Sequence, residues 1–128
     1  MVAGKKFKVH APGEEIRIVL ESLKAEGYTG LAHIFRIPTA EDKVAYYQKF
    51  SATELTGDGE KRQVTPRIDY WGGTNLLYDR CVLRVEDYVF PEGLENWKDC
   101  IPLEHKAEAI ELLLKKIGVP LKAEKVKN

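Results

Sequence analysis

An α+β domain is the fold class that this sequence predicts: a β-meander of about three antiparallel strands near the N-terminus, packed against three helices. Three observations support it. Apolar and β-branched residues alternate at period two early in the chain, residues 31–47 join a strand to a capped helix through a proline, and residues 103–117 carry an apolar stripe at helical spacing. A chain of 128 residues suits one domain, so we expect residues 1–128 to form a single domain.

The first two strands are predicted on either side of a Pro-Gly turn. Residues 7–11 alternate in the strand period, and the turn follows them. Residues 14–26 are ambiguous, because their apolar side chains fit both a period-two face and a helical stripe. The β-branched residues Ile16, Ile18 and Val19 favour a strand, and a helix stays open as the alternative.

A third strand and a helix are predicted around Pro38. The strand spans residues 31–37, since proline has no amide to donate to a strand partner and restricts the residue before it. Thr39 then caps a helix through its hydroxyl, and Glu41 and Asp42 place negative charge at the positive end of the helix dipole.

We expect this helix to run to about Glu54 and to pack on the sheet through Val44 and Tyr47. Tyr46 cannot share a helix face with its neighbour Tyr47, so we expect Tyr46 to be at least partly exposed. Residues 56–65 are polar and interrupted by two glycines, which predicts an exposed loop.

Two further helices are predicted in the second half of the chain. Four apolar side chains share one helical stripe: Leu77, Cys81, Val85 and Tyr88. We expect that helix to start at Thr74, because Gly72 and Gly73 break or delay it. The last helix opens at Pro102, a favoured first-turn residue, and stops at Gly118. Residues 1–5 and 121–128 are expected to be frayed.

The predicted core combines these faces. Its members are apolar residues on the inner stripes of the three helices: Val44, Tyr47, Leu77, Val85, Ile110, Leu114 and Ile117. Both cysteines, Cys81 and Cys100, are expected to be small buried side chains, because two cysteines are too few for a disulfide framework and their spacing matches no zinc motif.

Charge and hydropathy disfavour two classes of partner. The 20 basic residues balance the 20 acidic ones, whereas nucleic-acid binding needs clustered excess positive charge. The longest apolar run falls far short of the ~20 residues of a membrane helix, and the N-terminus lacks the apolar region of a signal peptide. We therefore expect no nucleic-acid or membrane partner and a cytoplasmic location.

No catalytic, cofactor or metal signature is evident. His10, His33 and His105 are not spaced as ligand pairs, and His33 is better explained as a structural histidine bonded to the backbone than as a metal ligand. Neither a nucleophile elbow nor a phosphate loop is present. We expect no cofactor, no metal and no enzymatic activity; a site built from Arg36, His33 and acidic neighbours is the enzyme alternative.

Large aromatic residues next to glycine and proline breaks are the candidate binding residues. Trp71, Trp97 and Tyr46 are predicted to contact a protein partner, because an aromatic ring with a polar group often anchors an interface. The alternative interpretation is that these rings fill the seam between sheet and helices.

Residues 35–47, with their strand, proline and Thr39 cap, and residues 99–114, which open the last helix, carry a family resemblance. The chain resembles tail assembly chaperones of long-tailed bacteriophages and prophages. The resemblance implies a non-enzymatic protein that binds tape-measure or tail-tube protein in the host cytoplasm or virion. It allows a homo-oligomer, and such chaperones are often made in two lengths by a frameshift.

Two other functions stay open beside this resemblance. Residues 6–37 are longer and richer in β-structure than the family leads us to expect, so another virion component, such as a tail-completion or connector protein, is one alternative. A small bacterial regulatory domain that binds a protein is the other.

Overall fold

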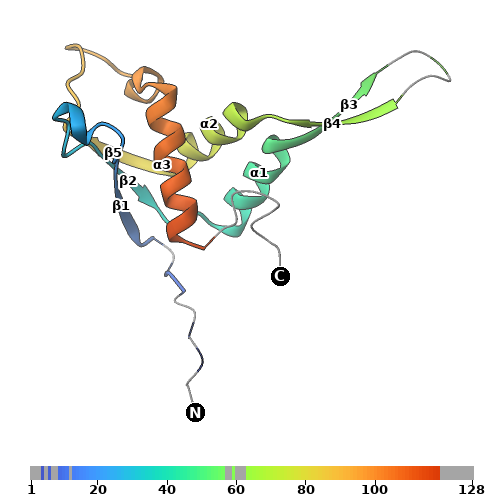
Figure 1. The fold of residues 1–128 in the computed structure, drawn as a ribbon, viewed down its shortest axis with the longest axis horizontal. Helices are drawn as coiled ribbons and strands as arrows, with labels where there is room; N and C mark the ends of the chain where they lie inside the picture. The colour runs from blue at the N-terminus through green and yellow to red at the C-terminus, as the bar shows by residue number, and fades with distance from the viewer. Residues whose placement is uncertain are drawn as a thin grey trace.

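A computed structural model describes residues 4, 6, 9–11, 13–56, 59 and 63–118; for residues 52–56 and 63–67 it describes the backbone alone. It confirms the α+β class, with a three-stranded antiparallel sheet and three helices (Figure 1). The strands of the sheet are β1 (Glu15–Val19), β2 (Ala32–Arg36) and β5 (Val82–Glu86). The helices are α1 (Ala40–Phe50), α2 (Tyr70–Cys81) and α3 (Leu103–Lys116). A separate hairpin joins β3 (Ser51–Thr56) to β4 (Gln63–Ile68), and two short 3-10 helices are η1 (Lys24–Glu26) and η3 (Trp97–Cys100).

Strand β2 is the centre of the sheet, with β1 on one side and β5 on the other. The strand interpretation of residues 14–26 holds for β1, where Ile16 pairs with Phe35 and Ile18 with His33. The 3-10 helix η1 then turns the chain and ends at Gly27, whose φ of 97° is left-handed.

The third strand of the sheet comes from a part of the sequence that we predicted to be helical. Residues 74–88 do not form one helix: α2 ends at Cys81, and Val82 opens β5, which pairs with β2. Leu77 and Cys81 fit a helical period, whereas the β-branched Val82 and Val85 favour a strand. The pairing with the free edge of β2 decides between helix and strand. In the predicted first strand, residues 9–11 are outside any strand, and Phe7 and Lys8 lie outside the described residues.

Helix α1 differs from its prediction in length and in orientation. It ends at Phe50 instead of near Glu54, because Ser51 enters strand β3 directly. The predicted loop 56–65 is also too long, since β4 already begins at Gln63. The expectation that Val44 and Tyr47 are core is wrong: they are 54% and 45% exposed.

The reason is that α1 packs against α2, which in turn packs against α3. The buried side of α1 therefore runs through Asp42 and Tyr46, one turn apart, with the partly buried Phe50 a turn further on. Tyr46 is 7% exposed, so the expectation that it is the exposed tyrosine of the pair is wrong as well.

Gly72 and Gly73 do not break helix α2. Asp69 caps this helix by accepting a hydrogen bond of 2.9 Å from the Gly72 amide. A Cβ atom on Gly73 would lie 3.0 Å from the Cβ of Phe50, so the missing side chain lets α1 approach α2 closely. The glycine pair supplies packing room instead of a helix stop.

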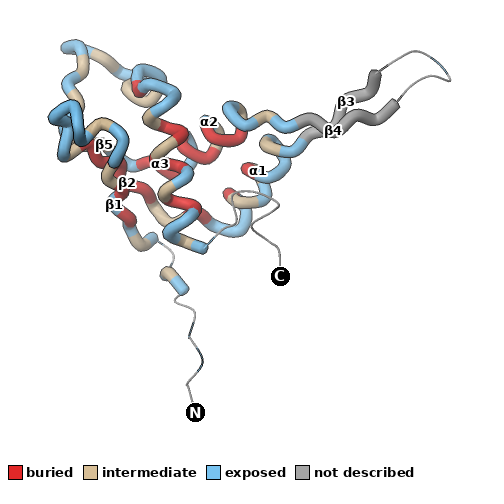
Figure 2. Tube along the Cα trace, viewed as in Figure 1, coloured by how far each residue is buried: buried red, intermediate tan, exposed pale blue. Residues whose placement is uncertain are grey.

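The core lies between the sheet and helices α2 and α3 (Figure 2). Leu77, Ile110 and Leu114 are buried as predicted, whereas Val85 and Ile117 are partly buried at its edge. The largest fully buried side chains are Tyr78, Phe35, Leu20, Leu77, Ile110 and Leu113. Within the described residues, no helix has the length and apolar character needed to cross a membrane.

Candidate functional site

The first candidate site is a continuous row of aromatic rings on α1 and α2, which we call the aromatic strip. Its members are Tyr46, Tyr47, Phe50, Tyr70 and Trp71. Successive ring centroids are 5.4 Å apart for Tyr46 and Tyr47, 5.5 Å for Tyr46 and Phe50, 6.3 Å for Phe50 and Tyr70, and 5.0 Å for Tyr70 and Trp71. The last turn of α1 and the first turn of α2 bring these rings together.

Three rings of the strip reach solvent. Tyr47 is 45% exposed, Tyr70 is 38% exposed and Trp71 is 48% exposed. The buried Tyr46 lies beneath them, and burial raises the pKa of its hydroxyl to about 12. Tyr47, Tyr70 and Trp71 therefore form the exposed face of the strip, and the buried Tyr46 ring contacts Tyr47 and Phe50.

A backbone hydrogen bond and a side-chain ion pair join the two halves of the strip. The Asp69 amide donates a hydrogen bond of 2.7 Å to the Phe50 carbonyl, which joins the end of α1 to the start of α2. The Lys49 ammonium lies 3.6 Å from the Asp69 carboxylate. The hairpin β3–β4 projects from this same end of the helix pair, away from the sheet (Figure 1).

The three predicted binding residues fall in different places. Trp71 belongs to the aromatic strip and is exposed. Tyr46 lies in the strip but is buried, so its neighbour Tyr47 takes the exposed position. Trp97 belongs to another group of rings: it is partly buried in η3, with its ring centroid 6.0 Å from that of Phe90.

The second candidate site is a chain of hydrogen bonds around His33, which we call the His–Tyr chain. The ring nitrogen Nδ1 of His33 lies 2.8 Å from the Tyr78 hydroxyl, and Nε2 lies 2.8 Å from the Tyr88 hydroxyl. The Tyr88 hydroxyl also lies 2.8 Å from Nδ1 of His105. His33 is a structural histidine, but its partners are tyrosine hydroxyls and not the backbone, contrary to the sequence prediction.

The His–Tyr chain is neutral at its centre. His33 is 0% exposed, and burial, with a smaller contribution from His105, lowers its pKa from 6.5 to about 4. Burial also raises the pKa of Tyr88 to about 12 and that of Tyr78 well above its ordinary value. At pH 7 the two tyrosines therefore keep their protons and His33 carries a single proton.

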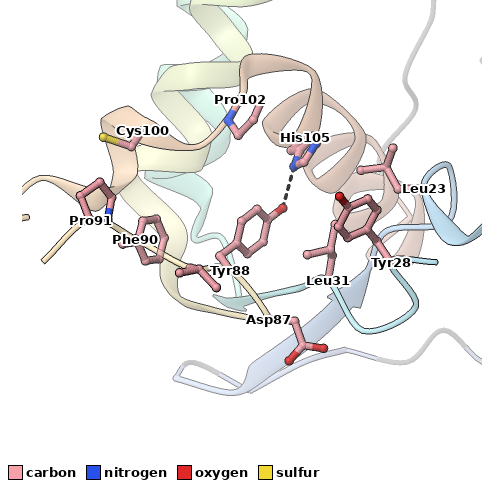
Figure 3. A pocket seen from close by; sticks show the side chains of 11 residues that line it. Leu23, Tyr28, Leu31, Asp87, Tyr88, Phe90, Pro91, Cys100, Pro102 and His105 are labelled. Carbon is pink, nitrogen blue, oxygen red and sulfur yellow. Dashed lines mark hydrogen bonds between the residues drawn. The ribbon is translucent and has the colours of Figure 1, made fainter. Parts of the chain in front are cut away.

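A pocket of about 600 Å³ opens beside this chain (Figure 3). Tyr88 and His105 line it on the side of the chain. Its apolar wall includes Leu23, Leu31, Val89, Phe90, Pro91 and Pro102. The volume lies within the range of small-molecule sites. Sequence reasoning missed the His–Tyr chain beside the pocket. Its members come from β2, α2, the segment after β5 and α3, and no local motif links them.

A third cluster of charged residues is structural. The Asp42 carboxylate, 2% exposed, accepts hydrogen bonds from Arg36 at 2.6 and 3.2 Å and from Arg80 at 2.9 Å. The carboxylate also completes the predicted cap: it accepts from the Thr39 amide at 2.8 Å, while the Thr39 hydroxyl accepts from the Asp42 amide at 3.2 Å. The bonds from Arg36, above all, hold the pKa of Asp42 well below its usual range.

The enzyme alternative joined Arg36 to His33. The two side chains belong to separate groups, because Arg36 binds Asp42 and the Arg80 carbonyl, whereas His33 binds two tyrosines. Among the described residues, no group of three or more histidine, cysteine or acidic side chains could hold a metal ion. Cys81 is buried as expected, but Cys100 is exposed.

Comparison with known proteins found no match to a protein-family model, to a curated protein or to a solved structure.

Proposed function

We propose that this protein acts by binding another protein through the aromatic strip, without catalysing a reaction. The observation that carries the proposal is the row of exposed rings that includes Tyr47, Tyr70 and Trp71. Tyrosine and tryptophan are enriched at protein interfaces, where a few of them carry most of the binding free energy. Val44, one turn before Tyr47, and Ile68, next to α2, extend the apolar surface and are also exposed.

The hairpin β3–β4 supports this proposal. A two-stranded hairpin is marginally stable in water by itself, and a partner that covers it stabilises it. Because β3 follows α1 directly and β4 leads into α2, a protein seated on the aromatic strip also reaches the base of the hairpin. The strip and the hairpin together form one candidate contact surface.

For the partner, we propose the class that the resemblance implies: a tape-measure or tail-tube protein that the chain assists during phage tail assembly, in the host cytoplasm or in the virion. In the two alternative roles, another virion component or a bacterial regulatory domain, the chain would bind a different partner through the same surface. The partner itself distinguishes these functions, whereas the site is common to them.

The test is pull-down, followed by measured affinity, with the products of the neighbouring genes, among which the proposal expects tail-tube and tape-measure proteins. Trp71→Ala should weaken binding by about 30-fold or more, since a tryptophan anchor is commonly worth ~2 kcal/mol. Tyr28→Ala is the matched control, because Tyr28 is 56% exposed and lies outside the strip.

Two results would contradict the proposal. Full affinity in both Trp71→Ala and Tyr47→Ala, each first shown to be folded, would mean that the strip is not the binding surface. Capture of a metabolic enzyme in place of tail proteins, with loss of binding in Trp71→Ala, would keep the strip and reject the role in tail assembly.

A further inference from the structure

The pocket beside the His–Tyr chain has an apolar wall that the described part of the chain leaves uncovered. Tyr28 is 56% exposed and Val89 is 99% exposed, and both line the pocket. Phe90 adds an aromatic wall and stacks on Tyr88, with centroids 6.2 Å apart and planes 19° apart. Removing such apolar and aromatic surface from water is favourable, so the pocket suits a flat apolar molecule.

The buried end of the His–Tyr chain determines which way its hydrogen bonds run. Tyr78 is 0% exposed, and Nδ1 of His33 is the acceptor that the described residues offer its hydroxyl. The hydroxyl therefore donates to Nδ1, because a buried donor without an acceptor is costly. His33, which is neutral, then carries its proton on Nε2 and donates it to the Tyr88 oxygen.

The same reasoning continues to the pocket. Since the Tyr88 oxygen already accepts from His33, its own proton is donated to Nδ1 of His105. His105 therefore carries its proton on Nε2, and no described residue accepts a hydrogen bond from that nitrogen. The chain thus presents an N–H donor from a residue that lines the pocket.

The charge around the pocket selects against an ionised ligand. No lysine or arginine lines it, so a bound carboxylate would have no counter-charge. Asp87 is the acidic lining residue, and its carboxylate packs against Gly30, where an added Cβ would clash with Oδ2. Figure 3 shows this carboxylate directed away from His105.

We propose that the pocket binds a small, uncharged aromatic molecule that carries one hydrogen-bond acceptor, such as a carbonyl oxygen. The ring lies against Tyr28, Val89 and Phe90, and the acceptor receives the Nε2 hydrogen of His105. Tyr88 is a positioning residue, because it holds the tautomer of His105. This binding site is separate from the aromatic strip and does not depend on the proposed protein partner.

The experiment is an NMR titration of the full ¹⁵N-labelled chain with three probes: acetophenone, ethylbenzene and benzoate. Acetophenone should shift the amide signals of residues 28–31, 87–91 and 103–105 saturably. Ethylbenzene lacks the acceptor and should bind about fivefold more weakly, the usual effect of one hydrogen bond, and benzoate more weakly than acetophenone. In His105→Phe, the affinities for acetophenone and ethylbenzene should become equal.

Two measurements keep the test decisive if His105→Phe does not fold. Val89→Asp changes an exposed side chain, so it should fold normally and weaken both uncharged probes. The imidazole ¹⁵N spectrum should show Nδ1 of His105 without a proton, and Tyr88→Phe should abolish this bias. Absence of saturable shifts, equal affinity of wild type for acetophenone and ethylbenzene, or strongest binding of benzoate would overturn the proposal.

Discussion

Mild acid should destabilise this protein through His33. The pKa of His33 falls from 6.5 in the unfolded chain to about 4 in the folded one, so between these values the unfolded state binds more protons. The stability that the neutral ring contributes is complete above pH 6.5 and is lost as the pH falls towards 4. At 1.36 kcal/mol per pKa unit, the loss between pH 7 and pH 5 is about 2 kcal/mol, and about 3 kcal/mol over the whole window.

This window separates His33 from the acidic groups. The pKa values of Asp42 and Glu108 are lowered from 3.8 and 4.5, so the stability that these carboxylates contribute is lost mainly below pH 4.5. The pKa of Asp42 is lowered mainly by its bond from Arg36. Partial burial raises the pKa of Glu108, but hydrogen bonds from Ser22 and Glu21 lower it by more. Measurements at pH 7, 6 and 5 therefore report on histidine.

The assay is urea unfolding followed by circular dichroism at each pH. His33→Gln should be less stable than wild type at pH 7, but its free energy of unfolding should fall much less between pH 7 and pH 5. Leu114→Ala is the control, since it removes part of a buried apolar side chain and no titratable group, and it should keep the wild-type dependence on pH. If His33→Gln lost as much stability as wild type between pH 7 and pH 5, the buried neutral ring would not be the cause.

The other predictions concern packing and capping. Leu114→Ala should lower the free energy of unfolding by ~2–5 kcal/mol, because Leu114 is 2% exposed, whereas Leu103→Ala on the same helix, at 38% exposure, should cost less than half as much; equal losses in urea unfolding would refute the packing of α3. Thr39→Ala should cost ~1 kcal/mol as a lost cap. Asp42→Asn should cost more, about 3 kcal/mol, since it also leaves Arg36 and Arg80 without their buried carboxylate; the reverse order in thermal or urea unfolding would contradict the described network.

The sequence by itself determined the elements whose signals are local. Strand β2 and the cap of α1 lie in consecutive residues: Pro38 ends the strand, and the hydroxyl of Thr39 and the carboxylate of Asp42 need only helical geometry to meet. Helix α3 has a single apolar stripe and a glycine stop, so its buried residues Ile110 and Leu114 could be predicted from spacing.

Only the tertiary structure decided which partner each element meets. The phase of α1 depends on its packing against α2, so neither Tyr46 nor Tyr47 could be placed from an aromatic pair alone. Residues 82–86 became strand β5 because the edge of β2 supplies its hydrogen bonds. The His–Tyr chain links His33 to Tyr78, Tyr88 and His105, which are separated from it by 45, 55 and 72 positions in the sequence. Hydrogen bonds over such separations follow from the fold and from no local pattern.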